Sequence, residues 1–185
     1  AKEFSKNKET IMLTAEIGVR KGLGSKLIMN YIRPNYSGLH FHIGIDPYGD
    51  MIYPHYDNTK PIKMDYGEKM YAEFQKDFAG EPRFNLLKMP DDVFFEKYYY
   101  GVEFYYDAKQ YVLNRYGLVH FDGPHKTSDV LTETIFFARR AAPGAVFIYD
   151  DWQKYNMAIC RDAAKEFGFE FITNGDRKTI LQKTK

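Results

Sequence analysis

Residues 118–151 read LVHFDGPHKTSDVLTETIFFARRAAPGAVFIYDD. This stretch holds two apolar runs, residues 118–122 and 145–150, on either side of a helical pattern over residues 126–142. The helical pattern begins near Thr127-Ser128-Asp129 and ends before Pro143-Gly144. These residue types favour the starts and the ends of helices, respectively. A strand, a helix and a second strand in this order predict a βαβ unit, in which the strands are parallel and the crossover is right-handed.

The same alternation of apolar runs and helical patterns extends over the rest of the chain. Further strands are expected at residues 11–17, 40–46, 84–89, 170–173 and 179–182. Further helices are expected at residues 26–32 and 66–78, from residue 91 towards residue 115, and at residues 156–167. Residues 47–65 are rich in Pro, Asp and Tyr and predict a long loop. Asn174-Gly175 predicts a hairpin between the last two strands.

These elements predict one α/β domain over residues 1–185. The fold is expected to be Rossmann-like and doubly wound, with a mostly parallel sheet of the seven-strand type and a C-terminal antiparallel hairpin at one edge. Ligands of such sheets bind at the carboxyl ends of the strands, near the switch in strand order. The residues that follow each strand are therefore the candidates for function.

The composition argues against several classes of protein. Among 185 residues, 26 Lys and Arg balance 25 Asp and Glu, which argues against a generic nucleic-acid binder. One cysteine excludes an internal disulfide and a cysteine-built zinc site, and fits a reducing compartment. No apolar run approaches the roughly 18 residues of a membrane helix, and the start, Ala1-Lys2-Glu3-Phe4, lacks a signal-peptide core. We therefore expect a cytoplasmic protein that does not enter the membrane.

The segment after the first expected strand is rich in glycine. Residues 16–25 read EIGVRKGLGS, which departs from the GxGxxG dinucleotide fingerprint but matches GxxxGxG from Gly18 to Gly24. Glycines allow tight turns and a close approach of a ligand, and the N–H groups that open the next helix favour an anion. Asp46, at the end of the second strand, can accept hydrogen bonds from both hydroxyls of a ribose. The alternatives are a plain turn and a capping aspartate before Pro47, but the two features together favour a nucleoside-containing cofactor.

Three carboxylates follow two strands that should be neighbours, because Asp122 ends one strand and Asp150 and Asp151 end the next. Like charges at one rim are costly unless a cation compensates them, and oxygen ligands favour Mg²⁺, then Mn²⁺ or Ca²⁺. A helix cap and a loop turn are the alternatives for these aspartates. His125 could take a proton from a hydroxyl that the ion has acidified, although an isolated loop histidine usually lies at the surface. No role is assigned to the other histidines, His40, His42, His55 and His120.

Taken together, these residues resemble the class I S-adenosylmethionine-dependent methyltransferases. The resemblance is greatest to the metal-dependent O-methyltransferase group, which includes the macrocin and mycinamicin sugar methyltransferases and, more distantly, catechol O-methyltransferase. It runs through almost the whole chain. Residues 16–22 are similar to the cofactor loop, residues 42–46 to the ribose-binding strand, and residues 122–125 with 143–151 to the metal site.

The resemblance implies a cofactor, a metal and a set of site residues. S-adenosylmethionine would be bound by Glu16, Gly18, Gly22, Gly24, Ser25, Asp46, Pro47 and Met89. Mg²⁺ (or Mn²⁺) would be bound by Asp122, Asp150 and Asp151. Asp122 and His125 would be the catalytic residues, with His125 three places after the first aspartate, where the catechol enzymes carry a lysine base. The implied reaction moves a methyl group to a hydroxyl of a small molecule, either sugar- or polyol-like or catechol-like.

The chain also departs from this group, because it begins almost directly at the first strand. The family usually has helices before that strand that cover the active site. We therefore expect either a minimal domain, with room for a partner subunit as in a homo-oligomer, or a loop that replaces this cover. Residues 47–65, with Tyr48, Tyr53 and Tyr56, are the other candidate for a cover, although an ordinary exposed loop fits them equally well. The 16 Tyr and 15 Phe as a whole fit either a core or a stacking surface.

Two other functions are consistent with parts of the sequence. A short-chain-type NAD(P)-dependent oxidoreductase would use GxxxGxG and the pair Tyr105-x-x-x-Lys109, but it would leave the acidic residues and His125 without a role. A non-catalytic binding module that keeps a cofactor fold is the second alternative, and the nearly complete set of metal ligands argues against it.

Overall fold

The computed structural model describes residues 11–184, apart from the side chains of residues 50, 64 and 65. The start of the chain, where the sequence shows no signal-peptide core, lies outside this range. The main sheet is formed by β1 (Ile11–Ile17), β2 (Leu39–Ile45), β5 (Phe84–Leu87), β8 (Tyr116–Phe121), β9 (Ala141–Tyr149), β10 (Phe169–Asn174) and β11 (Thr179–Lys183). The helices are α1 (Leu23–Asn35), α2 (Glu68–Phe78), α3 (Asp91–Lys97), α4 (Thr127–Ala138) and α5 (Met157–Lys165), with a 3₁₀ turn at Trp152–Lys154.

The strand order is β10-β11-β9-β8-β1-β2-β5. Five strands of this sheet are parallel, namely β1, β2, β5, β8 and β9, and β11 runs antiparallel to both β9 and β10. The order reverses direction between β1 and β8, which is the switch point where such sheets bind ligands. The expected mostly parallel sheet with a C-terminal antiparallel hairpin is therefore confirmed.

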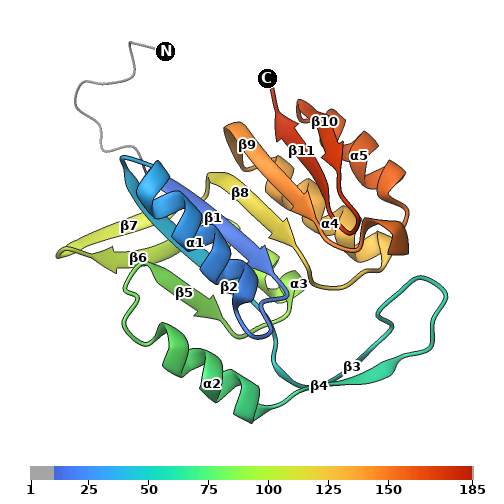
Figure 1. The fold of residues 1–185 in the computed structure, drawn as a ribbon, viewed down its shortest axis with the longest axis horizontal. Coiled ribbons are helices and arrows are strands. Elements are labelled where there is room, and N and C mark those ends of the chain that lie inside the picture. The colour runs from blue at the N-terminus through green and yellow to red at the C-terminus, as the bar shows by residue number, and fades with distance from the viewer. Residues whose placement is uncertain (1–10, 185) are drawn as a thin grey trace.

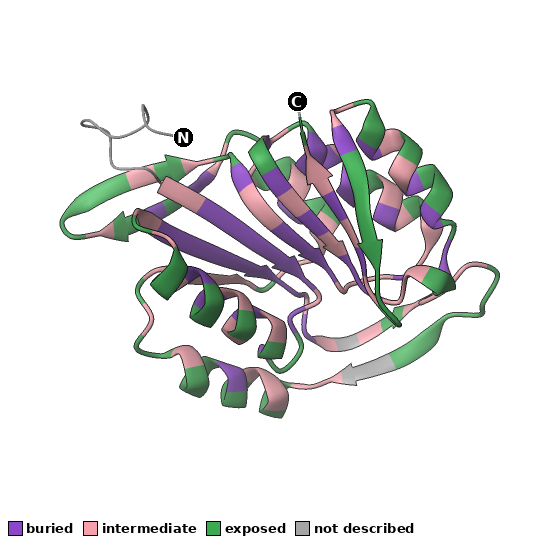
Figure 2. Cartoon of the chain, turned by 45° about the horizontal axis from the view of Figure 1, so that its top comes forward, coloured by how far each residue is buried: buried purple, intermediate pink, exposed green. Residues whose placement is uncertain are grey.

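Helices cover the two faces of this sheet (Figure 1). The face under α3, α4 and α5 holds the larger core, in which Phe94, Phe137 and Phe147 are fully buried. The face under α1 and α2 holds a smaller cluster around Met29 and Phe74. Figure 2 shows that the central strands are buried along most of their length. Much of the phenylalanine surplus therefore belongs to the core.

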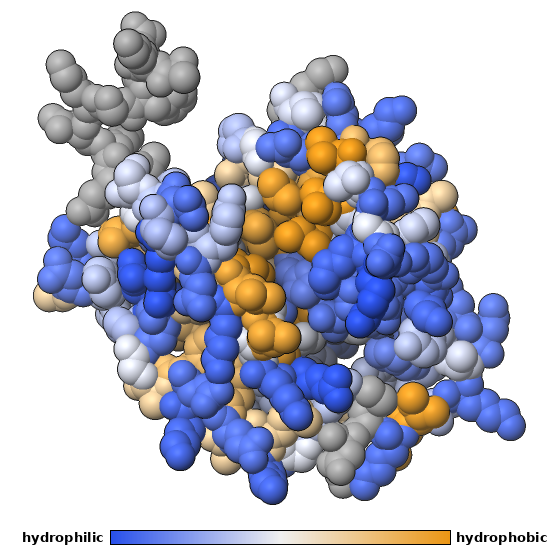
Figure 3. All heavy atoms as spheres, in the orientation of Figure 1, coloured by the Kyte–Doolittle hydropathy of each residue, from blue (hydrophilic) through white to orange (hydrophobic). Residues whose placement is uncertain are grey.

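Part of the face that carries α1 is open to the surface. Figure 3 shows apolar atoms as a band down the middle of this face, between hydrophilic flanks. The outward side of α1 adds Leu23 and Leu27, which are 68% and 63% exposed. Within residues 11–184, no helix is both long and apolar enough to cross a membrane.

The prediction of a long loop over residues 47–65 was wrong. Two strands, β3 (Gly49–Tyr53) and β4 (Ile62–Tyr66), pair antiparallel with each other and belong to no larger sheet. We call residues 47–66 the arm. It extends past the carboxyl ends of the parallel strands towards the segment that follows β8 (Figure 1).

The helix expected from residue 91 towards residue 115 was also wrong beyond Lys97. A second hairpin follows it, formed by β6 (Val102–Tyr106) and β7 (Lys109–Leu113). Its two turn residues, Asp107 and Ala108, have φ of 51° and 56°. Two consecutive positive φ values are the signature of a type I′ turn, which matches the twist of a two-stranded hairpin.

The helix expected at residues 126–142 ends earlier than its proline suggested. α4 stops at Ala138, and Pro143-Gly144 lies inside β9. The β8–β9 register shifts between Tyr116 and Leu118, opposite this part of β9, and Gly144 has φ of 77°. A proline without an N–H donor is tolerated at such an irregularity in a strand.

Candidate functional site

A cavity of about 1130 Å³ lies at the carboxyl ends of β1, β2, β8 and β9. Most of the residues that the sequence singled out line it, namely Glu16, Gly18, Gly24, Asp46, Pro47, Asp122, His125, Asp150 and Asp151. Three of them, Gly22, Ser25 and Met89, are not among the residues that line it. The arm supplies part of the wall through Met51, Tyr53, His55 and Tyr66.

Gly18 allows the loop after β1 to pack against the loop after β8. Its φ is 78°, and a Cβ there would overlap the backbone carbonyl of Asp122. Its N–H donates to the Ile45 carbonyl at 2.9 Å, which ties the same loop to β2. Only glycine combines this backbone conformation with so close an approach. The position of the loop after β1, which lines the cavity, is therefore fixed by backbone contacts.

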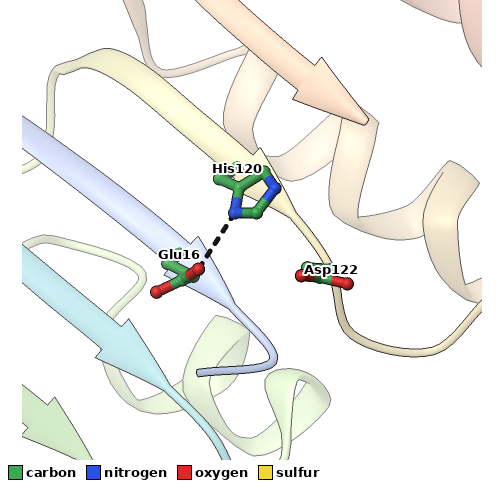
Figure 4. A group of neighbouring side chains, drawn as sticks. All are labelled: Glu16, His120 and Asp122. Carbon is green, nitrogen blue, oxygen red and sulfur yellow. Dashed lines mark hydrogen bonds and ion pairs between the residues drawn. The ribbon is translucent and has the colours of Figure 1, made fainter. Parts of the chain in front are cut away.

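Glu16 is fully buried at the end of β1. Two of the residues predicted to bind the cofactor, Gly24 and Ser25, contact its carboxylate. Its carboxylate accepts hydrogen bonds from Ser25 Oγ at 2.5 Å and from His120 Nδ1 at 2.9 Å (Figure 4). A Cβ on Gly24 would overlap Oε1 of this carboxylate. Gly24 and Ser25 thus make room for Glu16 and orient it, in addition to starting α1.

A chain of buried side chains leads to Glu16 from β2. Since Ser25 donates to Glu16, His42 Nε2 must donate to Ser25 Oγ, 2.9 Å away. His42 Nδ1 then accepts from Thr14 Oγ1 at 2.7 Å, and His40 Nε2 donates to Thr14 Oγ1 at 2.8 Å. Burial lowers the pKa of His40 to about 4 and that of His42 well below its usual value, so both rings are neutral at pH 7.

His120, to which the sequence assigned no role, approaches Glu16 from the opposite side. Lys178 Nζ lies 2.9 Å from His120 Nε2 and can only donate, so Nε2 accepts and Nδ1 carries the proton given to Glu16. The alternation of side chains along a strand could have indicated in the sequence that these histidines lie close to Glu16. His40 and His42 are two residues apart on β2 and share one face with Glu16 of β1, to which His120 of β8 is bonded.

Asp46 is held at the cavity by backbone donors. Its carboxylate accepts the N–H of Arg20 at 2.8 Å and the N–H of Tyr48 at 2.9 Å. Burial raises the pKa of Asp46 despite these hydrogen bonds. The Tyr48 hydroxyl donates to the Arg20 carbonyl at 2.6 Å, so this buried tyrosine supports the loop rather than facing a ligand. Each carboxylate oxygen keeps a lone pair for a further donor such as a hydroxyl.

Asp122 and Asp150 meet in the same cavity. One ligand atom from each, and one ring nitrogen of His125, lie within 4.8 Å of one another. Burial, with the Asp150 carboxylate beside it, raises the pKa of Asp122 to about 7. Burial would also raise the pKa of Asp150, but hydrogen bonding and the positive charges of Lys178 and Arg177 lower it overall. We call Asp122, His125 and Asp150 the acid cluster.

Two cations from the turn between β10 and β11 contact these carboxylates. Arg177 binds Asp150 Oδ2 at 2.9 Å and Asp151 Oδ1 at 2.8 Å, and Lys178 lies 2.9 Å from Asp150 Oδ1. Asp151, with φ of 44°, is paired with Arg177 and lies outside the group formed by Asp122, His125 and Asp150. The structure therefore brings together two of the three predicted metal ligands, and it adds two cations that the sequence did not indicate.

His125 is 5% exposed, and its Nδ1 lies 3.3 Å from Nε2 of His55 in the arm. Its other nitrogen, Nε2, is buried and has no hydrogen-bond partner in the described part of the chain. Burial, followed by the neighbouring His55, lowers the pKa of His125 to about 4. The ring is thus a neutral base or ligand with one nitrogen unused.

The acid cluster fits a hard divalent ion on the evidence of its own atoms. Two carboxylates converge there with one ring nitrogen of His125, and Nε2 of this ring has no hydrogen-bond partner among the described residues. A second group, Glu16 with His120 and Asp122, is equally compact (Figure 4). Glu16 and His120 already bind Ser25, Lys178 and each other, so this second group fits an ion less well.

The pair Tyr105 and Lys109 lies away from the cavity. Both residues belong to the β6–β7 hairpin, where Tyr105 faces Gln110 and Tyr106 faces Lys109. Neither is among the residues that line the cavity, and Tyr105 is 69% exposed. These positions do not support a short-chain-type oxidoreductase.

No protein-family model and no curated protein matches the sequence. Solved structures match the fold. The O-methyltransferase NovP is 15% identical, with a TM-score of 0.56 over 93% of this chain and 72% of that one. TomG from Streptomyces achromogenes, an O-methyltransferase involved in tomaymycin synthesis and solved in complex with S-adenosylmethionine, is 11% identical, with a TM-score of 0.55 over 94% and 73%. A ribosomal protein L11 methylase from Lactobacillus delbrueckii subsp. bulgaricus is 10% identical, with a TM-score of 0.51 over 95% and 72%.

At these identities the likeness concerns the fold alone. The strand order and the position of the cavity at the carboxyl ends of the parallel strands agree with the fold of these matches. This chain has the fold of the class I S-adenosylmethionine-dependent methyltransferases.

Proposed function

We propose that this protein is an S-adenosylmethionine-dependent O-methyltransferase. It transfers the methyl group to a hydroxyl of a small molecule and uses a divalent ion, Mg²⁺ or Mn²⁺. One observation carries this proposal. A single cavity is lined both by Gly18 and Asp46, which suit a nucleoside, and by the acid cluster, which suits a hydroxyl and an ion.

The cavity has room for a cofactor and an acceptor together. Its volume of about 1130 Å³ exceeds the roughly 300–1,000 Å³ of an ordinary small-molecule site. Bound S-adenosylmethionine supplies an electrophilic methyl group on its sulfonium. Asp46 would accept the ribose hydroxyls, and the backbone around Gly18 would admit the cofactor closely. The protein would contribute mainly by holding the two reactants in line, since positioning alone can supply about 7–11 kcal/mol.

At the acid cluster, His125 Nε2 would take the proton of the acceptor hydroxyl. The O–H bond breaks and an N–H bond forms. The oxygen electron pair forms the new O–CH₃ bond while the S–CH₃ bond breaks, which leaves a methyl ether and S-adenosylhomocysteine. Asp122 and Asp150 would hold the divalent ion, and Asp151 could join them if it released Arg177. The ion would supply positive charge that lowers the pKa of a nearby hydroxyl.

The arm would cover the acceptor. Tyr53 and Tyr66 line the cavity, and their rings could pack against the C–H groups of a sugar or against a phenol. Leu23 and Leu27 of α1 add an apolar wall on the other side. This mixture supports a sugar- or polyol-like acceptor or a catechol-like one. The single cysteine fits a reaction in the cytoplasm. An additional subunit could cover the open face beside α1.

Thermal shift separates the proposed function from its alternatives. The protein would be heated with S-adenosylhomocysteine, with NADH or NADPH, and with Mg²⁺. A ligand at about 100 times its dissociation constant adds roughly 2.7 kcal/mol to the free energy of unfolding, so a clear rise in melting temperature is expected with S-adenosylhomocysteine. Stabilisation by NADH or NADPH alone would contradict a methyltransferase, and no effect of any cofactor would favour a non-catalytic module.

Labelled methyl transfer from S-adenosylmethionine to a panel of sugars, polyols and catechols would then identify the acceptor. The same assay tests the ion, because the doubly substituted variant Asp150→Ala/Asp151→Ala should lose transfer. Transfer that is unchanged in this variant and insensitive to EDTA would show that no ion takes part. His125→Ala with a normal rate would place the base elsewhere, and Lys126 is the next candidate.

A further inference from the structure

The arm brings a second histidine to the acid cluster. His55 lies between β3 and β4 and lines the cavity. Its Nε2 is 3.3 Å from His125 Nδ1, and its Nδ1 is 3.3 Å from the hydroxyl of Tyr53. The three side chains form a short row that ends at His125 Nε2, the buried nitrogen without a partner in the described chain.

The backbone holds the two histidines together. The His125 N–H donates to the His55 carbonyl at 3.0 Å, and Tyr56 pairs with His125 in a parallel β-bridge. Two residues further on, the Asp57 carboxylate accepts the Thr127 N–H at 3.0 Å. The arm is thus attached directly to the segment that carries His125, and the ring contact follows from this attachment.

The contact between the two rings has a direction. The facing nitrogens, His125 Nδ1 and His55 Nε2, are 3.3 Å apart, so a hydrogen bond between them needs a proton on one nitrogen and a lone pair on the other. One ring must therefore donate and the other must accept. If His55 donated, His125 would carry its proton on Nε2, where a buried N–H would have no acceptor within hydrogen-bonding distance. Buried N–H groups without a partner are rare because they are costly.

If His125 donates instead, every N–H group of the two rings has a hydrogen-bond acceptor. His125 Nδ1 donates to His55 Nε2, and His55 Nδ1 donates to the Tyr53 hydroxyl. This arrangement leaves a lone pair on His125 Nε2, on the ring that lies within reach of Asp122 and Asp150. A lone pair in that place can accept a proton or bind a cation, and an N–H group there can do neither.

We propose that His55 is a positioning residue that selects the His125 tautomer with its proton on Nδ1 and thereby keeps Nε2 free as the base. This role rests on the proposed function, in which Nε2 receives the proton of the acceptor hydroxyl. The arm is then part of the proton-transfer machinery as well as a cover. Removing the His55 ring should impair transfer while the acceptor can still bind.

The direct test is the tautomer of His125, read from the ¹⁵N chemical shifts and long-range ¹H–¹⁵N couplings of the imidazole. The protein would be kept at pH 7 with EDTA and without cofactor, and His125→Gln would assign the signals. The wild-type ring should carry its proton on Nδ1. In His55→Leu it should shift to Nε2, the form that free imidazole prefers. His55→Gln, whose carbonyl oxygen can accept from Nδ1, should keep the wild-type pattern.

A kinetic test separates positioning from mere folding. His55→Leu should lower kcat about 10- to 100-fold, the usual effect of losing a partner that orients a ligand, while the KM for the acceptor stays within about threefold. His55→Gln should recover most of the rate. Ile52→Ala, a control on the same arm at a side chain that is 70% exposed, should change neither value.

Two results would overturn the proposal: a wild-type His125 with its proton on Nε2, or a His55→Leu variant with the wild-type tautomer. If His55→Leu does not fold, as judged by circular dichroism, the wild-type spectrum and His55→Gln still decide. These spectra need no cofactor, so they remain informative if the proposed function fails. That failure would be seen separately, as no binding of S-adenosylhomocysteine to the wild-type protein.

Discussion

The lining of the cavity has two parts that are built in different ways. We call Gly18 and Asp46 the nucleoside end and the acid cluster the acid end. At the nucleoside end, Gly18 and Asp46 follow directly after their strands and are held by backbone contacts. At the acid end, Asp122 and Asp150 also follow their strands, but side chains from distant segments complete their surroundings. His55 arrives from the arm, and Arg177 and Lys178 arrive from the β10–β11 turn.

This difference predicts that substitutions can affect cofactor binding and the methyl-transfer step separately. The nucleoside end depends on the local path of the chain, so its variants should affect folding and cofactor affinity. The acid end depends on charges and on a hydrogen bond between separate segments, so its variants should affect turnover. A set of substitutions can test whether the two ends are separable in this way.

The largest effect is expected at Asp122. Asp122→Asn keeps the shape of the side chain and removes its charge from the acid cluster. Methyl transfer should fall by at least about 100-fold, while the affinity for S-adenosylhomocysteine in calorimetry changes less than about threefold. Asp162→Asn, at an exposed position of α5, is the matched control. A normal rate in Asp122→Asn would remove the acid end from the mechanism.

The next effect concerns folding at the nucleoside end. Gly18→Ala places a methyl group against the Asp122 carbonyl and forces alanine into a positive φ. The free energy of unfolding in urea should fall by at least about 2 kcal/mol. At Gly80, a Cβ would meet no heavy atom within 4 Å, so Gly80→Ala should stay within about 0.5 kcal/mol of wild type. Equal stability of the two variants would mean that the loops after β1 and β8 are not packed as described.

A smaller effect is expected at Asp46. Asp46→Asn weakens the acceptor offered to a ribose, and a hydrogen bond to a charged group is worth about 1.5–3 kcal/mol. Calorimetry should show about a tenfold weaker affinity for S-adenosylhomocysteine, with Mn²⁺ binding unchanged. A variant that loses Mn²⁺ but keeps S-adenosylhomocysteine would reverse the roles of the two ends.

The smallest effect is a pH dependence at the start of β2, at the opposite end of this strand from Asp46. Burial, with Arg33 and Arg83 nearby, lowers the pKa of His40 from 6.5 to about 4. The unfolded chain therefore binds a proton more readily than the folded one, and stability is lost as pH falls below about 6.5. Between pH 7 and pH 6 this loss is roughly 0.7 kcal/mol for one such histidine. His40→Gln should flatten the urea stability profile by that amount, and an unchanged profile would mean that His40 is not buried as a neutral ring.

The strands of the main sheet could be predicted because each strand is an apolar run with a clear end. The two hairpins outside the main sheet could not. Asp107-Ala108 forms a turn with two positive φ values but lacks the glycine by which such turns are recognised. The strands of the arm, β3 and β4, pair only with each other among the described residues, and residues 49–53 show no strong alternation.

At the site, residues that directly follow a strand could be predicted, and those delivered by distant segments could not. Asp46, Asp122 and Asp150 were found because parallel strands end at one edge. Nothing in the sequence indicates that Lys178 reaches His120 or that His55 reaches His125, since both contacts depend on how hairpins fold back. The roles of Gly24 and Ser25 beside Glu16 were hidden for the same reason.

The central claim is that both ends belong to one methyl-transfer site. A crystal structure of the protein with S-adenosylhomocysteine and Mn²⁺ tests it most directly. We expect the ribose hydroxyls on the Asp46 carboxylate, the sulfur facing the acid cluster, and an anomalous manganese peak between Asp122 and Asp150. A cavity that stays empty at saturating ligand, or S-adenosylhomocysteine bound with its ribose away from Asp46, would contradict the claim.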